Sequence, residues 1–413
     1  MLGTKEPLLW HLFPELKSQM AAAYPELERA SALIVETLRH EETRFRDMLG
    51  RGLRLLEDEI GQMRGQELAG DVAFRLYDTF GFPLDLTQDA LRERGLTVDI
   101  AGFDAAMEKQ RAEARANWSG SGEEATETVW FDLRNTHGAT EFVGYTATQA
   151  EGVVQAIRAD GDLVETATTG QQVDFIINQT PFYAESGGQV GDTGVVTNDA
   201  GLEIAITDTR KKLGDLHVLS GEIKAGTLEE GTQVYQNVDR VRRGHVRAHH
   251  SATHLLHEAL RRVLGPHVTQ KGSLVSAEHL RFDFSHPRAL SAEEIFEVER
   301  LVNAMIRAND EVSTRLMTPD EAIEAGALAL FGEKYGEEVR VLAMGGDRDS
   351  ARGGHFSVEL CGGTHVRRLG DIGVFIVGQE TAIASGVRRI EAFTGSAALQ
   401  FIATRDRILQ ATT

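Results

Sequence analysis

Cysteine is almost absent from this sequence, since Cys361 is the single cysteine among 413 residues. An internal disulfide is therefore excluded, and a lone cysteine is more typical of a metal ligand, a nucleophile or a small buried side chain. Long apolar runs are also missing, because none approaches the roughly 20 residues that span a bilayer. The first residues, MLGTKEPLLW, lack the basic-then-apolar order of a secretory signal. These absences favour a cytoplasmic protein without a membrane partner.

Positive charge is scarce in the chain as a whole, and nucleotide-binding motifs are absent. The formal net charge is −20, which taken alone argues against a nucleic-acid partner, because phosphate binding needs positive surface. The sequence has no GxxxxGK[ST] and no convincing GxGxxG after a predicted strand. Basic residues nevertheless gather in the second half, and a solvated surface with scattered ion pairs explains them as well as an RNA-binding patch does. They are Arg210, Lys211, Lys212, Arg242, Arg243, Arg247, Arg367, Arg368, Arg388 and Arg389.

The length of the chain predicts two or three domains. Residues 1 to about 115 show helical spacing of apolar side chains, interrupted by the turn signal Gly81-Phe82-Pro83. The polar stretch that follows Trp118 is the best linker candidate. From about residue 128, short β-type runs alternate with Gly and Asp, which predicts a small antiparallel barrel. The runs are VVQAIR, QQVDFII, EIAITDT and LHVLSG.

Helices return from about residue 244, mixed with further strands. The segment from His250 to Leu264 is apolar at helical spacing, and Ser291 opens a second helix with a capping box. LRFDF alternates cleanly, and VRVLAM, SVEL and VFIV are apolar runs typical of strands. The last segment, from about Ser396, begins another helix.

Two histidines four residues apart form the first candidate site. His250 and His254 in HSATH lie on one face of a helix, a spacing that can hold one metal ion. HxxxH also occurs by chance in helices. Zinc proteases of the HExxH type place a glutamate general base directly after the first histidine. Ser251 stands there in this chain, so a protease would lack its catalyst.

A second motif, Cys361-Gly-Gly-Thr-His365, follows over a hundred residues later. A thiolate and an imidazole separated by two glycines suit a tight turn around an ion, and SVEL would deliver Cys361 from the end of a strand. The alternative is a buried cysteine that only fills space. Together the two motifs make a Cys-His₃ set, which suits Zn²⁺.

A glycine-rich stretch, TPFYAESGGQVGDTG, is the third candidate. Its glycines allow a backbone to approach a ligand closely, and Ser186, Gln189 and Asp192 offer donors and acceptors. Without the metal motifs, a glycine-rich hairpin loop of the barrel is the better explanation of the stretch.

These motifs resemble the alanyl-tRNA synthetase family over essentially the whole chain. LYDTFGFPLDLT and HEETRFRDMLGRGL are similar to its helical tRNA-recognition domain, and PFYAESGGQVGDTG to the barrel that follows. The editing domain is matched in order by HSATHLLHEALRRVLGPHVTQKGSLV, LRFDFSH, LFGEKYGEEVRVL, ELCGGTH and GVRRIEAFTG. Free-standing editing proteins of the AlaX type share the metal motifs but not the long helical N-terminus.

The resemblance implies an α+β protein in four parts. We expect a helical tRNA-recognition domain at 1–125, a β-barrel subdomain at 126–243, an α/β zinc-binding editing domain at 244–395 and the start of a connecting helix at 396–413. Two regions of the family are expected to be absent: the class II aminoacylation domain with its ATP and alanine sites, which would be separate or missing, and the C-terminal region. His249 also departs from the family, which usually has asparagine there.

The family's editing reaction hydrolyses tRNA-Ala wrongly charged with serine or glycine, because a pocket for alanine rejects neither strongly. The resemblance implies that His250, His254, Cys361 and His365 hold Zn²⁺. The ion would then either activate a water molecule that attacks the ester at the mischarged 3′ end, or hold that ester in position. Gln270, which either faces the pocket or makes a loop hydrogen bond, and Ser186, as a sensor of the serine hydroxyl, are weaker catalytic candidates.

Asp78 in LYDTFGFP matches a position that the family uses to read a G·U pair in the acceptor stem of tRNA-Ala; the alternative is an aspartate that caps the turn before Gly81.

Three function classes remain. They are the deacylase, a non-catalytic tRNA-binding module with a structural zinc, and an unrelated metallohydrolase.

Overall fold

The structure is a computed structural model. It describes residues 6–412 except 22, 25, 30, 64, 81, 93, 118–122, 325–326, 328–337 and 348–353. The chain divides into two compact units, residues 1–123 and 124–413, which are described separately. The predicted linker after Trp118 lies mostly outside the described residues. None of the described helices combines the length and the apolar character that crossing a membrane requires.

Unit 1 is built of helices, as the periodicity predicted. Its single described strand pairing joins two parallel two-residue strands, β1 (Glu67–Leu68) and β2 (Thr97–Val98). Phe82 is buried in the core, and Gly52 allows this, because a Cβ there would lie 2.1 Å from the Phe82 ring. Phe82, which belongs to the predicted turn signal, thus serves packing. The helices are α1 (Leu9–Met20), α2 (Glu26–Arg29), α3 (Ser31–Gln62), α4 (Gly70–Phe80), α5 (Leu84–Arg92) and α6 (Ile100–Asn117).

Unit 2 begins with a closed six-stranded antiparallel barrel, which confirms the predicted barrel. The barrel closes because β13 pairs with β9 on one side and with β4 on the other. Trp130 and Leu133 of α7 (Glu123–His137) pack against its outside. The barrel strands follow the order β4 (Gln149–Ala159), β7 (Gln172–Ile177), β11 (Leu216–Ala225), β10 (Glu203–Lys212), β9 (Gly194–Thr197) and β13 (Gln233–Val238).

Several short strands lie outside the six-stranded barrel. β5 (Asp162–Val164) extends the pairing of β4, while β3 (Glu141–Phe142) pairs in parallel with β8 (Gln179–Thr180). A further antiparallel pair joins β6 (Thr166–Thr168) to β12 (Thr227–Glu229). The interior is filled by alternate strand residues such as Phe175, which is fully buried, as expected for strands with one inward face.

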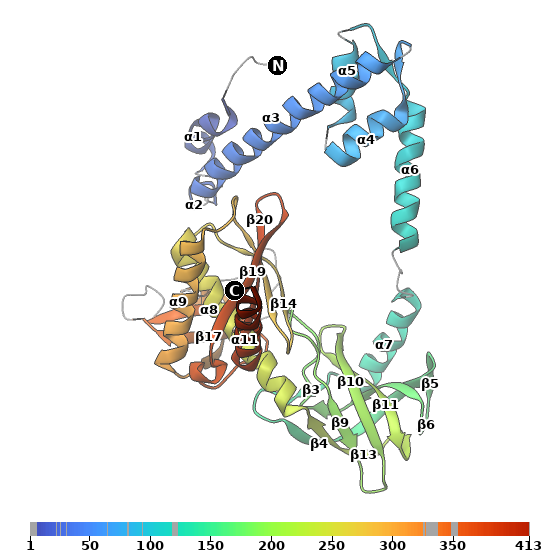
Figure 1. Ribbon diagram of the computed structural model, residues 1–413. Helices are drawn as coiled ribbons and strands as arrows, with labels where there is room; N and C mark the ends of the chain where they lie inside the picture. The colour runs from blue at the N-terminus through green and yellow to red at the C-terminus, as the bar shows by residue number, and fades with distance from the viewer. Residues whose placement is uncertain are drawn as a thin grey trace. The chain divides into compact units, whose positions relative to one another are not determined.

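The rest of unit 2 packs helices against two antiparallel sheets, with one large core and a smaller cluster between α10 and the second sheet. Figure 1 shows α8 and α9 beside these strands, with α11 at the chain's end. All pairings described here are antiparallel, so α+β fits this part better than the expected α/β. The first sheet is β14 (Gln270–Val275), β15 (Leu280–Ser285), β20 (Val387–Thr394) and β19 (Phe375–Ala384). The second is β16 (Ser313–Met317), β17 (Val339–Gly346) and β18 (His355–Leu360). The helices are α8 (Arg240–Leu264), α9 (Ala292–Ala308), α10 (Pro319–Glu324), η1 (Leu369–Ile372) and α11 (Gly395–Thr412).

The predicted strands LRFDF, SVEL, VRVLAM and VFIV lie in β15, β18, β17 and β19. The capping box at Ser291 is also confirmed: its hydroxyl accepts from Glu294 N, and the Glu294 carboxylate accepts from Ser291 N. The finer domain boundaries at 243 and 395 stay predictions.

Candidate metal centre

Helix α8 carries the first pair of candidate ligands. It begins at Arg240, earlier than the sequence suggested, because the carboxylate of Asp239 accepts hydrogen bonds from the first free N–H groups of the helix. His250 and His254 therefore lie in the middle of a long helix and not near its start. Their rings are buried and stacked with centroids 5.2 Å apart, as i and i+4 spacing requires.

The second pair comes from the turn that follows β18. This strand ends at Leu360, so it delivers Cys361 as SVEL predicted. Arg340 Nη1 donates to the carbonyl oxygens of Cys361 at 3.0 Å and Gly363 at 2.9 Å, and Tyr145 Oη donates to the carbonyl of Gly362 at 2.8 Å. The Arg340 guanidinium lies over the Tyr145 ring, 4.2 Å from its centroid. Three successive carbonyls are thus held by two side chains from other parts of the fold.

The four predicted ligands meet in one cluster. One nitrogen each of His250, His254 and His365 and the sulfur of Cys361 all lie within 4.8 Å of one another. The Cys361 sulfur is 3.5 Å from His250 Nε2 and 3.2 Å from His365 Nε2. The three histidines are buried, and Cys361 is partly exposed. The structure therefore brings together residues separated by more than a hundred positions.

Each imidazole is oriented through its Nδ1 atom. His250 Nδ1 lies 2.7 Å from Gln189 Oε1, and His254 Nδ1 lies 2.6 Å from Glu359 Oε2. Because both partners are acceptors, each Nδ1 carries a proton, and Nε2 is the ring nitrogen that can bind a metal. Burial opposes protonation of His254, but the charges of Glu359 and Cys361 raise its pKa to about 10, so a bound cation would replace the proton on Nε2. His365 Nδ1 similarly faces Ser251 Oγ at 3.2 Å. This arrangement of supporting groups is typical of histidines that bind a metal through Nε2.

His254 provides a direct test of whether a metal fits. Its Nε2 atom is buried and has no hydrogen-bond partner among the described residues. A buried polar nitrogen without a partner is costly, and a cation at the centre of the cluster would supply one. The donor set of one thiolate and three imidazoles suits Zn²⁺.

Glu359 is a functional candidate that the sequence analysis did not single out. Its carboxylate accepts from Nδ1 of His254 and, at 2.8 Å, from Nδ1 of His257. Burial opposes its ionisation, but the neighbouring charges of His257 and His254 hold its pKa well below the usual range. A signal was present in the sequence, because residues i and i+2 of a strand share a face and Glu359 precedes Cys361 by two.

The electrostatics of the cluster favour a thiolate. Burial raises the pKa of Cys361, but the adjacent histidine charges outweigh burial and lower the pKa well below its ordinary value. Burial lowers the pKa of His365 to about 3, so its ring is neutral near pH 7. A thiolate and a neutral imidazole are the forms that bind a metal.

A barrel loop completes the cluster through Gln189. This side chain is fully buried; its Oε1 also accepts from Thr364 N at 2.9 Å, and its Nε2 donates to Thr364 Oγ1 at 2.9 Å. Gln189 therefore joins the ligand helix to the ligand turn. The loop is fixed to β14, since Val275 N donates to the carbonyl of Gly188 at 2.7 Å. Gly188 has φ +85°, and a Cβ there would meet Ser273 Oγ at 2.4 Å. The third sequence candidate is thus part of the site as well as a barrel loop.

Ser186 and Gln270 both border that loop. Ser186 exchanges backbone hydrogen bonds with Gln189, and its carbonyl accepts from Tyr183 Oη at 3.1 Å. Gln270 begins β14, and its amide donates to Ser273 Oγ at 3.2 Å. Ser186 thus belongs to the turn that presents Gln189, whereas Gln270 reaches this turn only through Ser273, whose hydroxyl donates to the carbonyl of Gly187 at 3.5 Å. Their catalytic roles stay predictions.

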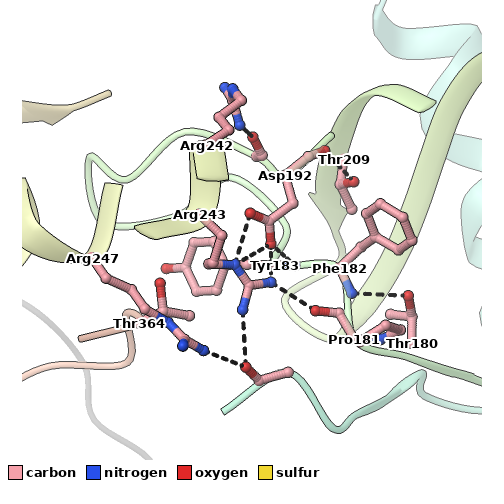
Figure 2. Close-up of polar contacts among 12 residues, drawn as sticks. Thr180, Pro181, Phe182, Tyr183, Asp192, Thr209, Arg242, Arg243, Arg247 and Thr364 are labelled. Carbon is pink, nitrogen blue, oxygen red and sulfur yellow. Dashed lines mark hydrogen bonds and ion pairs between the residues drawn. The ribbon is translucent and has the colours of Figure 1, made fainter. Parts of the chain in front are cut away.

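A buried ion pair attaches α8 to the barrel (Figure 2). Arg243 Nε donates to both carboxylate oxygens of Asp192, at 2.8 and 2.9 Å, and its other nitrogens donate to the carbonyls of Gly144 at 3.0 Å and Pro181 at 2.7 Å. Asp192 also accepts from Tyr183 N at 2.6 Å. Removing one partner of such a pair typically costs about 3–5 kcal/mol. Because Asp192 follows Gln189 in the same loop, the pair fixes the distance from barrel to ligand helix.

His249 is buried on α8 and has different partners from this network. Its Nδ1 donates to the carbonyl of Ser276 at 2.9 Å, and its Nε2 accepts from Thr394 N at 3.1 Å. Burial, more than any neighbouring charge, lowers its pKa to about 4. The neutral ring thus joins α8 to β20 and to the β14–β15 turn, a structural role for the residue that departs from the family.

Comparison with known proteins identifies the family of the chain. A family model described as "tRNA synthetases class II (A)" matches residues 1–242. The chain is 63% identical to the alanine–tRNA ligase of Parvibaculum lavamentivorans over 99% of its length, and 59% identical to that of Sphingopyxis alaskensis over 100%. This chain belongs to the alanyl-tRNA synthetase family. It spans about 46% of the length of each of these relatives.

A second family model bears on the metal centre. The model "Threonyl and Alanyl tRNA synthetase second additional domain" matches residues 339–391, which include Cys361 and His365. The class II match at 1–242 covers the helical unit and the barrel together. It corrects the expectation that the class II region is wholly absent, because part of the region described by that model is present here.

Asp78, the predicted tRNA-reading residue, lies in unit 1 in the last turn of α4, with an exposed side chain. Gly81, on which the alternative depends, lies outside the described residues. The reading of a G·U pair by Asp78 is therefore carried forward as a proposal.

Proposed function

We propose that this chain hydrolyses the ester of tRNA-Ala mischarged with serine or glycine, at a zinc site formed by His250, His254, Cys361 and His365. The observation that carries the proposal is the convergence of three Nε2 atoms and one thiolate sulfur, with acceptors positioned behind the Nδ1 atoms. Membership of the alanyl-tRNA synthetase family supports tRNA as the partner.

The chain's own residues orient the ligands and keep them in the protonation states that bind a metal. Gln189 and Glu359 accept from Nδ1 of His250 and His254, and Ser251 Oγ contacts Nδ1 of His365, so Nε2 is the nitrogen that each ring can offer to a metal. When bound, zinc supplies a Lewis acid that polarises an ester carbonyl or lowers the pKa of water. Glu359 is already engaged by two histidines, so it is a positioning residue and not the general base of a protease-like mechanism.

A tRNA-binding module with a structural zinc is the second candidate function. Four protein ligands make a closed tetrahedral site, which is usual for structural zinc. The unequal burial of the ligands favours catalysis, however, because Cys361 is partly exposed while the histidines are buried. A substrate can approach the cluster from the cysteine side. An unrelated metallohydrolase is disfavoured by the family assignment and by Ser251 in place of the glutamate base.

Selection of serine over alanine needs a polar group near the ester. We propose Ser186 and Gln270 for this role, since Ser186 lies in the turn that presents Gln189 and Gln270 donates to Ser273, which contacts the same turn. A polar group that loses its partner when alanine replaces serine is left unpaired at a cost of roughly 1–3 kcal/mol. For glycine, we propose that the missing methyl group lets the ester approach the metal more closely.

Recognition of tRNA-Ala is assigned to unit 1 in this proposal. Asp78 would accept from the amino group that a G·U pair exposes in the minor groove, whereas phosphate contacts would supply most of the affinity. Asp78→Asn should then reduce discrimination between G·U and Watson–Crick variants of tRNA-Ala more than it reduces overall binding. A cytoplasmic location stays an expectation.

Aminoacylation is the activity named for the full-length relatives, so both its presence and its absence in this chain are matters for proposal. We expect no alanine activation by the chain alone, because the resemblance assigns the ATP and alanine sites to a region its motifs do not include. The class II match at 1–242 makes this expectation worth testing. Alanine-dependent pyrophosphate exchange above background would contradict it.

The deciding experiment compares hydrolysis of Ser-, Gly- and Ala-tRNA-Ala by the zinc-loaded, chelator-treated and zinc-restored chain. We expect fast hydrolysis of the first two esters, slow hydrolysis of the third, loss of activity on chelation and recovery with zinc. Equal rates for all three esters, or full activity without metal, would overturn the proposal. Bound zinc and raised thermal stability without hydrolysis would instead establish the structural-zinc module.

A further inference from the structure

A cavity beside the metal cluster has no role in the function proposed so far. It has a volume of about 520 Å³ and lies within unit 2. Its walls come from three places: the part of α8 just before the ligands, the segment after His365, and the start of α11. The lining residues fall within the ranges 244–248, 366–373 and 394–396.

One wall carries an arginine that lacks a carboxylate of its own. Arg247 donates to the carbonyl of Gly144 at 3.2 Å, and its Nε is buried without a hydrogen-bond partner among the described residues. Burial first, and then the charge of Arg243, lower its pKa to about 10 against the opposing effect of Asp192, which is already paired with Arg243. The positive charge of Arg247 is therefore not neutralised by a carboxylate partner of its own.

The other walls add to this positive character. Arg367 is exposed and makes no ion pair within the described part of the chain. Gly395 and Ser396 begin α11, and the N-terminal end of an 18-residue helix favours anions. Asp371 is the one carboxylate in the lining, and it already accepts from Arg368 N at 3.1 Å. An anion is thus the ligand type that these walls suit.

The position of the cavity narrows the choice of anion. Arg247 precedes His250 by three residues on α8, a rise of about 4.5 Å along the helix, and Arg367 follows His365 by two residues. The cavity therefore begins within one helical turn of the cluster. An ester bound at the cluster belongs to the 3′-terminal nucleotide of an RNA strand, so the next phosphates of that strand must pass nearby.

We propose that this cavity binds a backbone phosphate of the RNA strand whose 3′ ester reaches the metal cluster, through Arg247, Arg367 and the N-terminal end of α11. The inference rests on the proposed deacylase function. Arginine suits this task because its planar guanidinium matches the geometry of phosphate. The cavity then holds the strand in place while the ligand residues act on its end.

The first test measures RNA binding as a function of salt. The probe is an RNA hairpin with the acceptor stem of tRNA-Ala and its single-stranded 3′ end. Arg367→Ala should weaken binding roughly tenfold at low salt and reduce the slope of log K against log salt by about 0.7, the value for one phosphate of a single strand. Arg315→Ala removes an exposed arginine outside the cavity and serves as the matched control. Equal slopes for the two variants would overturn the proposal.

A second variant separates binding from folding. Ser396→Asp places a negative charge in the first turn of α11. This charge is attracted by the positive N-terminal end of the helix dipole, so the variant should have an unchanged or higher Tm. The same charge should repel a phosphate in the cavity and weaken binding of the hairpin. A variant with unchanged hairpin affinity would count against the phosphate site, whatever its Tm.

A third measurement distinguishes this inference from the proposed function. For seryl-tRNA-Ala, Arg367→Ala should lower kcat/KM about tenfold more than for 3′-O-seryladenosine, which has no phosphate. If the wild type hydrolyses neither ester, the deacylase proposal fails while the salt measurement still tests the cavity. If inorganic phosphate binds as tightly as the hairpin does, the cavity is a free-anion site and the RNA assignment is wrong.

Discussion

The two halves of the metal cluster are held in place in different ways. His250 and His254 take their separation from the regular backbone of α8, in the middle of a 25-residue helix. Cys361 and His365 lie in a turn without regular secondary structure, and their positions depend on Arg340, Tyr145 and the amide of Gln189. Helical ligand pairs are therefore specified locally, whereas the turn needs contacts from the barrel and from β17.

Removal of a ligand should have the largest effect and tests whether both halves are needed. Cys361→Ala should abolish zinc binding and hydrolysis of Ser-tRNA-Ala, because it removes the only thiolate, and His250→Ala should do the same from the helical half. Metal content and single-turnover hydrolysis check this. Binding of tRNA through unit 1 should persist in both variants. Full activity of either variant without metal would contradict the cluster's role.

A methyl group added to the turn at Gly363 should damage zinc binding almost as much as removal of a ligand, whereas one added at Gly362 should be harmless. A Cβ at Gly363 would lie 2.1 Å from His250 Cε1 and 2.9 Å from Gln189 Oε1, whereas at Gly362 the nearest atom is Tyr145 Oη at 4.0 Å. Gly363→Ala should therefore lose most of its zinc, and Gly362→Ala should keep it. Equal zinc affinities in a competition titration would show that the turn is not fixed against the helix.

Loss of an orienting carboxylate should have a smaller effect. Glu359→Gln keeps the size of the side chain but removes the charge that fixes Nδ1–H of His254, so zinc affinity should fall roughly 10–100-fold. Glu311→Gln, at an exposed position, is the matched control. Competition with a chromogenic chelator measures both variants. A Glu359 variant with the affinity of the control would limit Glu359 to a packing role.

The smallest effect concerns a buried histidine that serves only the barrel. His217 Nδ1 donates to the carbonyl of Phe182 at 3.1 Å, and burial lowers its pKa from the ordinary value of 6.5 to about 4. The unfolded state therefore binds more protons between these values, so the free energy of unfolding falls as pH drops below about 6.5 and stops falling near pH 4. One pKa unit corresponds to about 1.4 kcal/mol.

His217→Gln should flatten this acid dependence, because glutamine keeps a donor but does not titrate. Urea unfolding of wild type and variant between pH 7 and pH 5, followed by tryptophan fluorescence in a background with Trp10→Phe and Trp118→Phe, measures the two slopes, because Trp130 then reports on the barrel. Identical slopes would show that His217 becomes protonated without loss of its hydrogen bond.

The sequence predicted the features of the site that depend on local spacing. HxxxH gave two ligands on one helical face, SVEL placed Cys361 at a strand end, and alternating runs indicated the barrel strands. Gln189 was identified only as a possible donor in a glycine-rich loop. Glu359, Tyr145 and Arg340 were not identified, because each acts on a residue brought near by folding. The only available signal was that Glu359 precedes Cys361 by two residues, and Tyr145 and Arg340 had none.

The sequence by itself determined the ligand types, their pairing into two motifs and the family of the chain, since these depend on residue identity and on distances along the backbone. Only the tertiary structure decided that the two motifs meet, that a barrel loop inserts Gln189 between them and that the Arg243–Asp192 ion pair holds the barrel against α8. The physical reason is that a helix or strand fixes positions a few residues apart, whereas contacts over a hundred residues apart exist only once the packed core has formed.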